Sequence, residues 1–150
     1  MRRPPRSPAE SVFAHGLGAH ALVLGLLMAG IALGTQAWAW NAGLPEWQTL
    51  VFTMLCFMQL GHVLAIRSER TSLLRQGLLS NRPLLGAVVL TVVLQLAVVY
   101  VPGLNAVFGT VPLSPAQLAG AALAAVLIWA VVEVEKWARR LGQLRMAQVG

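Results

Sequence analysis

Long apolar stretches alternate with short polar segments along this chain, in the pattern of a membrane protein. No charged residue occurs between Glu10 and Glu46. The apolar core over 17–40 is long enough to cross about 30 Å of hydrocarbon. A polar turn over 41–46 separates it from a second apolar stretch over 47–66. We therefore expect two membrane-spanning helices over 17–40 and 47–66.

The second half of the chain repeats this arrangement. After a basic segment, no formal charge occurs until Glu133, and this stretch is too long for a single span. Its middle, residues 102–115, holds prolines and glycines, which break helices and indicate a hairpin. We expect spans over 84–101 and 116–132, followed by a cytoplasmic tail over 133–150.

The basic residues predict the orientation of these spans. All eleven Lys and Arg residues lie within 2–6, 67–82 and 136–145. If two spans cross each gap between these segments, every positive charge lies on one side of the bilayer, as the positive-inside rule requires. The sequence predicts an all-α, integral membrane four-helix bundle with N and C termini cytoplasmic. Residues 1–16 would be a cytoplasmic basic segment and 17–150 the four-span domain with its tail.

The composition agrees with a membrane location. With 57% hydrophobic and 11% charged residues, the chain has too little polar surface for a soluble domain. A net charge of +6 would normally suggest nucleic acid as a partner. Because the basic residues flank apolar stretches, we expect membrane lipids as partners and no nucleic acid.

Chemistry that enzymes need is missing from the sequence. The chain has no aspartate, so it offers neither an aspartyl-phosphate nucleophile nor a Ser-His-Asp triad. It also has no G-x-x-x-x-G-K-[ST] phosphate loop. We expect no catalytic residue, no nucleotide-binding residue and no cofactor in this chain, which would not be an enzyme in isolation.

Small residues are frequent in two of the spans and would let helices approach closely, so these faces are expected to pack against protein. A compositional bias of the genome is the alternative explanation. The residues are Gly25, Ala29, Ala32 and Gly34 in the first span and Ala119, Gly120, Ala121, Ala122, Ala124 and Ala125 in the fourth.

Strongly polar residues within spans are the candidates for function. Gln59 and His62, three residues apart, lie on one side of the second span. An amide oxygen is a suitable ligand for a hard cation, and His62 could titrate during transport. The alternative is an interhelical hydrogen bond, and it applies also to His20 and to Gln95.

A charged cluster marks the end of the fourth span. Glu133 and Glu135 lie close in sequence to Lys136, Arg139 and Arg140. We expect these residues to form ion pairs at the membrane interface.

The end of the second span carries a more specific signal. Residues 61–73 read G-H-V-L-A-I-R-S-E-R-T-S-L, and they closely resemble the segment after the eighth membrane helix of cation-transporting P-type ATPases. Calcium pumps of that family have a similar N-A-L-N-x-x-S-E-x-x-S-L run. Further matches follow in the same order: Asn81 with Leu84 and Leu85, Leu94-Gln95-Leu96, Tyr100-Val101-Pro102, Phe108, Pro112-Leu113, and the E-x-x-K-x-x-x-R pattern of Glu133, Lys136 and Arg140.

The resemblance extends over essentially the whole chain. Residues 1–6 with 10–13 resemble the cytoplasmic loop between helices six and seven of the same pumps. The chain is therefore similar to helices seven to ten of the calcium-pump-like group. The resemblance implies part of an ATP-driven cation translocase, which supports and partly lines the ion path without being catalytic alone.

The resemblance also implies partners and site residues. In this family ATP phosphorylates an aspartate of a D-K-T-G-T motif, and ions bind among helices four, five, six and eight. ATP and Mg would bind domains that this sequence lacks, and the partners would be those helices, the phosphorylation domain and a metal cation. Gln59 takes the eighth-helix ligand position, where muscle-type calcium pumps have a glutamate. Glutamine in place of glutamate removes one negative charge from the site. This fits a pump with one fewer calcium site or with a different cation preference.

The resemblance assigns two further sets of residues. A coupling loop of Arg2, Arg3, Pro4, Pro5 and Arg6 would contact the phosphorylation domain and helix five, and its alternative role is a basic tether for anionic lipid. A cytoplasmic interface would comprise Ser68, Glu69, Glu133, Lys136 and Arg140. We expect the plasma (inner) membrane of a bacterium as the location.

Two other classes of function remain for this sequence. The chain could be a free-standing four-helix membrane protein that binds or regulates a partner without transport. A small independent transporter is less well supported, because internal repeats are not evident and charges within the spans are absent.

Overall fold

The chain is built of α-helices over the residues that the structure describes. The computed structural model describes the backbone over residues 17–66 and 82–149 and the side chains over 20–66 and 82–138. In chain order its helices are α1 (Leu17–Asn41), α2 (Trp47–Ile66), α4 (Arg82–Tyr100), α5 (Pro102–Phe108) and α6 (Pro115–Val149). By length and composition, 4 of these helices can cross a membrane, namely α1, α2, α4 and α6. The predicted all-α, four-span class is thereby confirmed.

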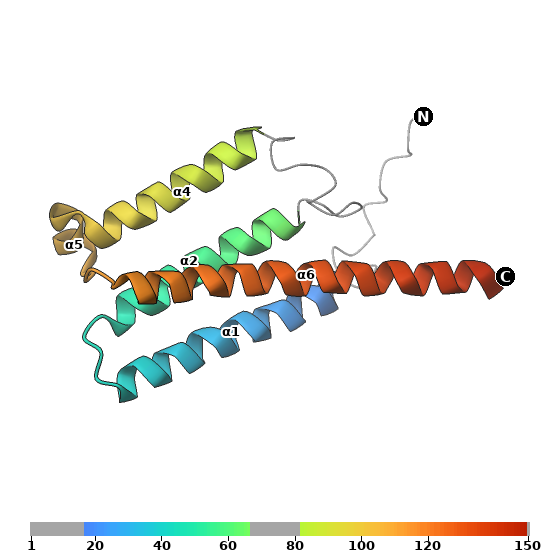
Figure 1. Cartoon of the computed structure of the whole chain (residues 1–150), viewed down its shortest axis with the longest axis horizontal. Helices are drawn as coiled ribbons and strands as arrows, with labels where there is room; N and C mark the ends of the chain where they lie inside the picture. The colour runs from blue at the N-terminus through green and yellow to red at the C-terminus, as the bar shows by residue number, and fades with distance from the viewer. Residues whose placement is uncertain (1–16, 67–81, 150) are drawn as a thin grey trace.

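The four long helices run in alternating directions (Figure 1). The connections over 42–46 and 101–114 lie together at one end, which we call the hairpin end. Arg82 at the start of α4 and Lys136 in α6 lie toward the opposite end, which we call the basic end. The positive-inside rule assigns the basic end to the cytoplasm.

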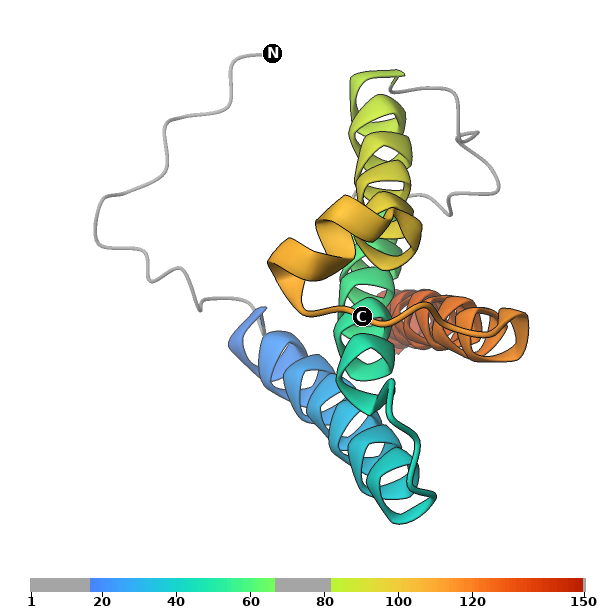
Figure 2. The ribbon, with the colours of Figure 1, turned by 90° about the vertical axis from the view of Figure 1, so that its left-hand side faces the viewer.

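Helix α2 is the central element of the bundle. It packs against α6, α1 and α4, and a view along the bundle shows it between these three helices (Figure 2). Its many buried residues are Thr49, Leu50, Thr53, Met54, Phe57, Met58, Gly61 and Ala65. A rotation of α2 about its axis would therefore disturb all of its neighbours at once.

The apolar core consists of three clusters placed one after another along α2. Leu50 contributes to the cluster nearest the hairpin end, together with Ala39, Val99 and Leu113. Met54, Phe57 and Met58 form the middle of the core with Ala32, Ala121, Ala124 and Ile128. Ala65 packs with Leu24 and Val132 near the basic end. All of the clusters thus include α2.

Helix α4 packs closely over only part of its length. The buried residues of α4 are Gln95 and Val99, both in the half of α4 nearer the hairpin end. Toward the basic end α4 diverges from α6 (Figure 1). There Val88 and Val92 line a cavity instead of a packed core. Helix α4 is therefore held mainly at one end.

Two helix backbones approach very closely where α2 crosses α6. A Cβ atom added to Gly61 would lie 3.1 Å from the carbonyl carbon of Ala125 and would overlap its carbonyl oxygen. Glycine is therefore required at this position by space, because any side chain would push the two helices apart. Gly61 was not among the small residues singled out from the sequence.

The expectation about small residues holds for only some of them. Ala32, Ala121 and Ala124 are buried in the core. Others are exposed in this chain, and these are Gly25, Ala29, Gly34, Ala119 and Ala122. The reason is the helical period, since only every third or fourth residue of α1 and α6 can face α2.

The connection after α4 contains a helix where breaks were expected. Pro102 stands in the first turn of α5, where its missing N–H is harmless, and Gly109 ends the helix with φ 64°. The amide of Asn105 donates to the carbonyl oxygens of Val98 and Val99 at 3.0 and 2.8 Å. These bonds tie the hairpin to the end of α4.

Helix α6 is longer than the expected fourth span. It begins at a capping box, in which the backbone N–H of Ser114 donates to Oε1 of Gln117 at 2.8 Å and that of Gln117 donates to Oγ of Ser114 at 3.3 Å. It continues through the predicted cytoplasmic tail to Val149. The tail lacks proline, so nothing in its sequence ends the helix earlier.

Replacing Gly61 with alanine tests the crossing of α2 and α6. We expect Gly61→Ala to destabilise the bundle by about 1–3 kcal/mol, the usual effect of overpacking. Gly25→Ala is the matched control, because a Cβ added there meets nothing within 4 Å. Reversible unfolding in mixed detergent micelles measures both, and equal stability of the two variants would contradict this account of the crossing.

Candidate functional site

Gln59 is exposed on a side of α2 that the other described helices do not cover. It precedes Gly61 by two residues, which on an α-helix corresponds to about 200° of rotation. Because Gly61 faces α6, Gln59 faces nearly the opposite direction. Its amide is therefore available to groups outside the four-span bundle.

Gln59 belongs to an exposed strip that runs along the length of α2. The strip follows helical spacing, and its members are Gln48, Phe52, Leu55, Gln59, Val63 and Ile66. Apolar residues flank the amide on both sides along the helix. We call this surface the α2 strip, and it has the character of a surface that packs against further membrane helices.

His62 does not share the exposure of Gln59. It is partly buried, and its ring centroid lies 6.2 Å from that of His20 in α1. Its Nε2 atom is buried and has no hydrogen-bond partner among the described residues. The two residues predicted on one side of the span thus differ in surroundings, Gln59 facing outward and His62 lying beside α1.

Gln95 links two helices of the bundle. Its side chain is 6% exposed, and its Nε2 donates a hydrogen bond of 3.0 Å to Oγ1 of Thr53 in α2. This is the interhelical hydrogen bond that was considered as the alternative to a role in the ion path. The neighbouring hydroxyl of Thr49 also acts between elements, accepting from the backbone N–H of Val111 at 2.9 Å.

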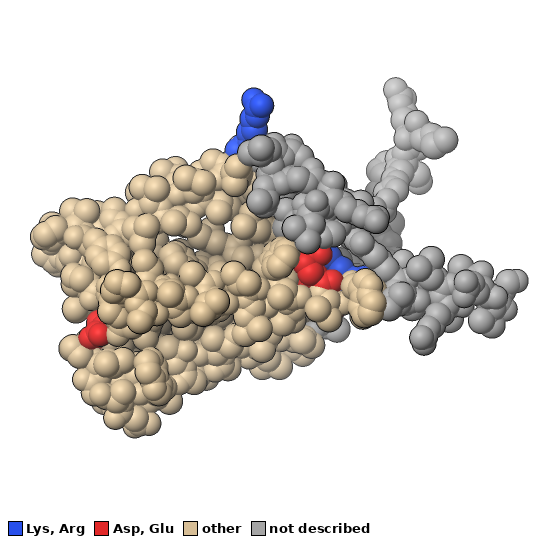
Figure 3. Space-filling model, in the orientation of Figure 1, with Lys and Arg blue, Asp and Glu red and all other residues tan. Residues whose placement is uncertain are grey.

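Charged side chains gather at the basic end of α6. Lys136 donates to Oε1 of Glu133 at 3.0 Å and to the carbonyl oxygen of Ala65 in α2 at 2.5 Å. Oε2 of Glu135 lies 2.5 Å from Nδ1 of His20 in α1. In Figure 3 red and blue atoms touch one another in this region. The cluster joins α6 to both α1 and α2.

The remaining residues of the sequence prediction lie outside the described part of the chain. These are Arg2, Arg3, Pro4, Pro5 and Arg6 of the coupling loop and Ser68, Glu69 and the side chain of Arg140 of the cytoplasmic interface. Their roles stay predictions.

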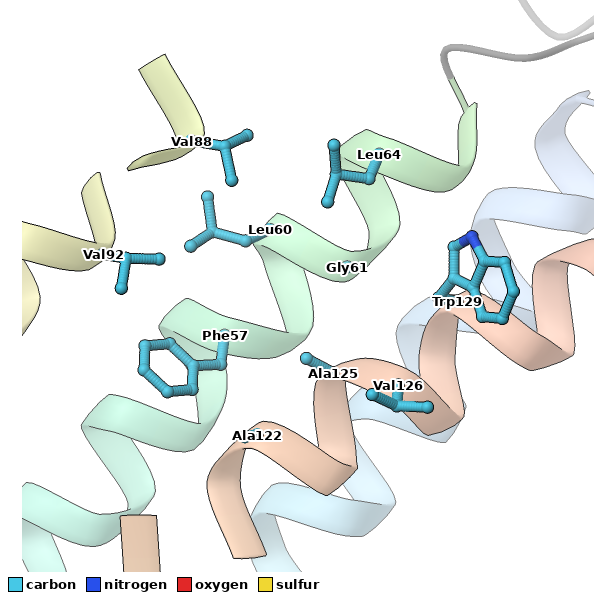
Figure 4. A pocket seen from close by; sticks show the side chains of 10 residues that line it. All are labelled: Phe57, Leu60, Gly61, Leu64, Val88, Val92, Ala122, Ala125, Val126 and Trp129. Carbon is cyan, nitrogen blue, oxygen red and sulfur yellow. The ribbon is translucent and has the colours of Figure 1, made fainter. Parts of the chain in front are cut away.

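An apolar cavity of about 520 Å³ lies between α2, α4 and α6 (Figure 4). Leu60 and Leu64 of α2, Val88 and Val92 of α4 and Val126 of α6 are among its lining residues. Apolar and aromatic side chains make up the whole lining, so the cavity is suited to hydrocarbon and not to an ion.

The described residues hold no self-contained metal site. Within 17–66 and 82–149, no group of three or more His, Cys, Asp or Glu residues is arranged to hold a metal ion. A cation that binds at Gln59 would need further ligands from outside these helices.

Sequence reasoning missed the polar partners that join the helices. Thr53 was not singled out, although it accepts the hydrogen bond from Gln95. Glu46 was noted only as a charge, but its Oε1 accepts from Nε2 of Gln117 at 2.6 Å and so connects the first turn to α6. No local pattern marks these residues, because their partners are 42 and 71 positions away.

Comparisons with known proteins point to one family. The chain matches the model of the family described as "Cation transporting ATPase, C-terminus" over residues 1–138. It is 36% identical to the "Calcium-transporting ATPase" of Bacillus subtilis (strain 168), over 77% of this chain and 13% of that protein. It is 30% identical to "Calcium-transporting ATPase type 2C member 2" of Mus musculus, over 99% of this chain and 16% of that protein.

A human relative gives a similar result. "Calcium-transporting ATPase type 2C member 1" of Homo sapiens is 34% identical over 76% of this chain and 13% of the relative. The chain thus spans between 13% and 16% of the length of these relatives.

A double-mutant cycle tests the link between α2 and α4. We expect Gln95→Leu and Thr53→Val to show a coupling energy of about 0.6 kcal/mol, and at most about 1.7, as found for hydrogen bonds between membrane helices. Thr91→Val is the control partner, since the Thr91 hydroxyl donates to Ala87 O within its own helix. Unfolding free energies of the single and double variants give the coupling, and additive effects at positions 53 and 95 would refute the link.

Proposed function

This chain belongs to the family of cation transporting ATPase C-termini, and on that premise we propose that it supports and partly lines the ion path of an ATP-driven cation pump. The observation that carries the proposal is the outward-facing Gln59 on the central helix of the bundle. A polar group in a span is expensive unless it meets a polar partner. A cation path beside the α2 strip supplies that partner.

The proposed partners follow from the orientation of α2. Its free side would adjoin membrane helices four to six of the pump, and a metal cation would bind between them and Gln59. ATP and Mg would bind domains beyond the helices described. The chain is an integral membrane protein, and we place it in the plasma membrane of a bacterium, which the Bacillus subtilis relative supports.

The chemistry of Gln59 bears on the identity of the cation. An amide oxygen is a neutral ligand for a hard cation, whereas a glutamate would add a full negative charge. A site with Gln59 attracts a divalent ion less strongly than a site with a glutamate at the same position would. We therefore propose a calcium-pump-like transporter with one fewer calcium site or with a different cation preference.

The segments at the basic end would connect the spans to the rest of the pump. We assign the coupling role to Arg2, Arg3, Pro4, Pro5 and Arg6, which would contact the phosphorylation domain. The hydrogen bond from Lys136 to the carbonyl oxygen of Ala65 would keep α6 aligned with α2 while those contacts change.

A chimera tests the proposed function. The corresponding C-terminal region of the Bacillus subtilis ATPase is replaced by this chain, and cation-stimulated ATP hydrolysis is measured in membranes. We expect stimulation to be retained, because the four spans would restore the support for the ion path. A chimera that inserts into the membrane but responds to no cation would sink the proposal and favour a partner-binding protein without transport.

Within an active chimera, Gln59→Ala tests the ligand role. Loss of an interaction with a charged group, worth about 1.5–3 kcal/mol, would raise the cation concentration for half-maximal ATP hydrolysis by roughly tenfold or more. Gln48→Ala is the control, since it lies on the same α2 strip but at the hairpin end. Unchanged cation dependence of Gln59→Ala would remove Gln59 from the ion path and leave the family-level role intact.

A further inference from the structure

Three helices bring titratable side chains together near the basic end of the bundle. His20 of α1 and Glu135 of α6 are 115 positions apart in sequence, yet Nδ1 and Oε2 lie 2.5 Å apart. His62 of α2 completes the group, with its ring centroid 6.2 Å from that of His20. We call these residues the histidine cluster. It is the place where α1, α2 and α6 meet through ionisable groups.

The contact between His20 and Glu135 requires a proton. When Glu135 is ionised, a bare Nδ1 and the carboxylate oxygen would both be acceptors and would repel each other at 2.5 Å, so in that state Nδ1 carries the hydrogen and donates it to Glu135. Nε2 of a neutral ring keeps a lone pair. A second proton there makes His20 an imidazolium, and the hydrogen bond to Glu135 becomes charge-assisted and stronger.

His62 supplies the second observation. Its Nε2 is buried and has no partner among the described residues, whereas buried polar atoms in proteins are nearly always hydrogen-bonded. The rings of His20 and His62 are so close that a positive charge on one ring disfavours a positive charge on the other. The cluster is therefore suited to hold one added proton and not two.

A metal ion suits the histidine cluster less well than a proton does. The described helices contain no group of three or more His, Cys, Asp or Glu residues arranged to hold one. A proton needs no such geometry, and a single acceptor nitrogen suffices.

We propose that His20, His62 and Glu135 form a proton-binding site that strengthens the contact between α1 and α6 when it is loaded. The proton comes from water at the basic end and bonds to a ring nitrogen of His20, and no other bond breaks. His20 and Glu135 keep 18% and 29% of their side chains exposed. The site is separate from Gln59 and does not depend on an ion path there.

Other titratable or charged residues lie near the cluster along the sequence, and they enter the test. On α6, Glu133 and Lys136 pair with each other at 3.0 Å, and Arg139 follows Glu135 by one helical turn. On α2, Cys56 lies nearly two turns from His62, toward the hairpin end. Within the described part of α1, His20 is the one residue that has a titratable side chain. Glu133 and Arg139 are therefore the residues to use as controls.

The test measures the thermal midpoint of the full chain in nanodiscs at about pH 5.5 and about pH 8, the range in which histidines titrate. We expect the midpoint to be higher at the lower pH by roughly 2–4 °C. The sign follows from the charges, because a proton added to His20 places a positive charge beside the carboxylate of Glu135. His20→Gln and Glu135→Gln should each abolish the difference, and His20→Lys should keep the higher midpoint at both pH values.

Controls separate the cluster from its surroundings. Glu133→Gln and Arg139→Gln should retain the pH difference, whereas His62→Gln should enlarge it, because no competing proton can then bind beside His20. A pH difference that survives in both His20→Gln and Glu135→Gln would overturn the proposal. An unchanged difference in His62→Gln would overturn the three-residue site. If His20→Gln does not fold, Glu135→Gln and His20→Lys decide the question.

Discussion

The contact between Gly61 of α2 and the backbone of Ala125 fixes the rotation of the central helix, and the positions of the other helices follow from it. Small residues permit such approaches in membranes, where close packing replaces the hydrophobic effect as the force between helices. With Gly61 against α6, His62 lies next to α1 and Leu60 faces the side of α4. Gln59 lies on the side of α2 that the other described helices leave exposed. One missing Cβ atom therefore determines which polar residue faces out of the bundle.

The polar residues of the spans follow a common rule. Gln95 bonds to Thr53, His20 to Glu135 and Lys136 to the carbonyl of Ala65, each on a different helix. In hydrocarbon an unpaired polar group is costly, so each of these pairs also fixes how two helices lie against each other. The apolar core alone would allow helices rich in Ala, Val and Leu to slide, and the polar pairs add the directional restraint.

Much of the architecture could be predicted from the sequence, because hydrocarbon thickness and the placement of Lys and Arg constrain the spans strongly. The resemblance around Ser68 and Glu69 identified the family, which the match over residues 1–138 confirms. The direction in which each side chain points could not be predicted. Spans that are apolar on every side carry no amphipathic signal, so the exposure of Gly25 and Ala122 and the role of Gly61 depend on tertiary contacts. Thr53, the hydrogen-bond partner of Gln95, could not be predicted for the same reason.

The attachment of α4 at one end has a consequence for how this bundle can vary in evolution. Around Val99, where α4 meets Leu50 and Leu113, a change of side-chain volume must be matched on three segments at once. Around Val88 and Val92 the same change faces the cavity and meets little resistance. Sequence drift should therefore be slow at the hairpin end of α4 and fast in its other half. Related pumps would then share a conserved anchor while the surface of the same helix diverges with the lipids and proteins around it.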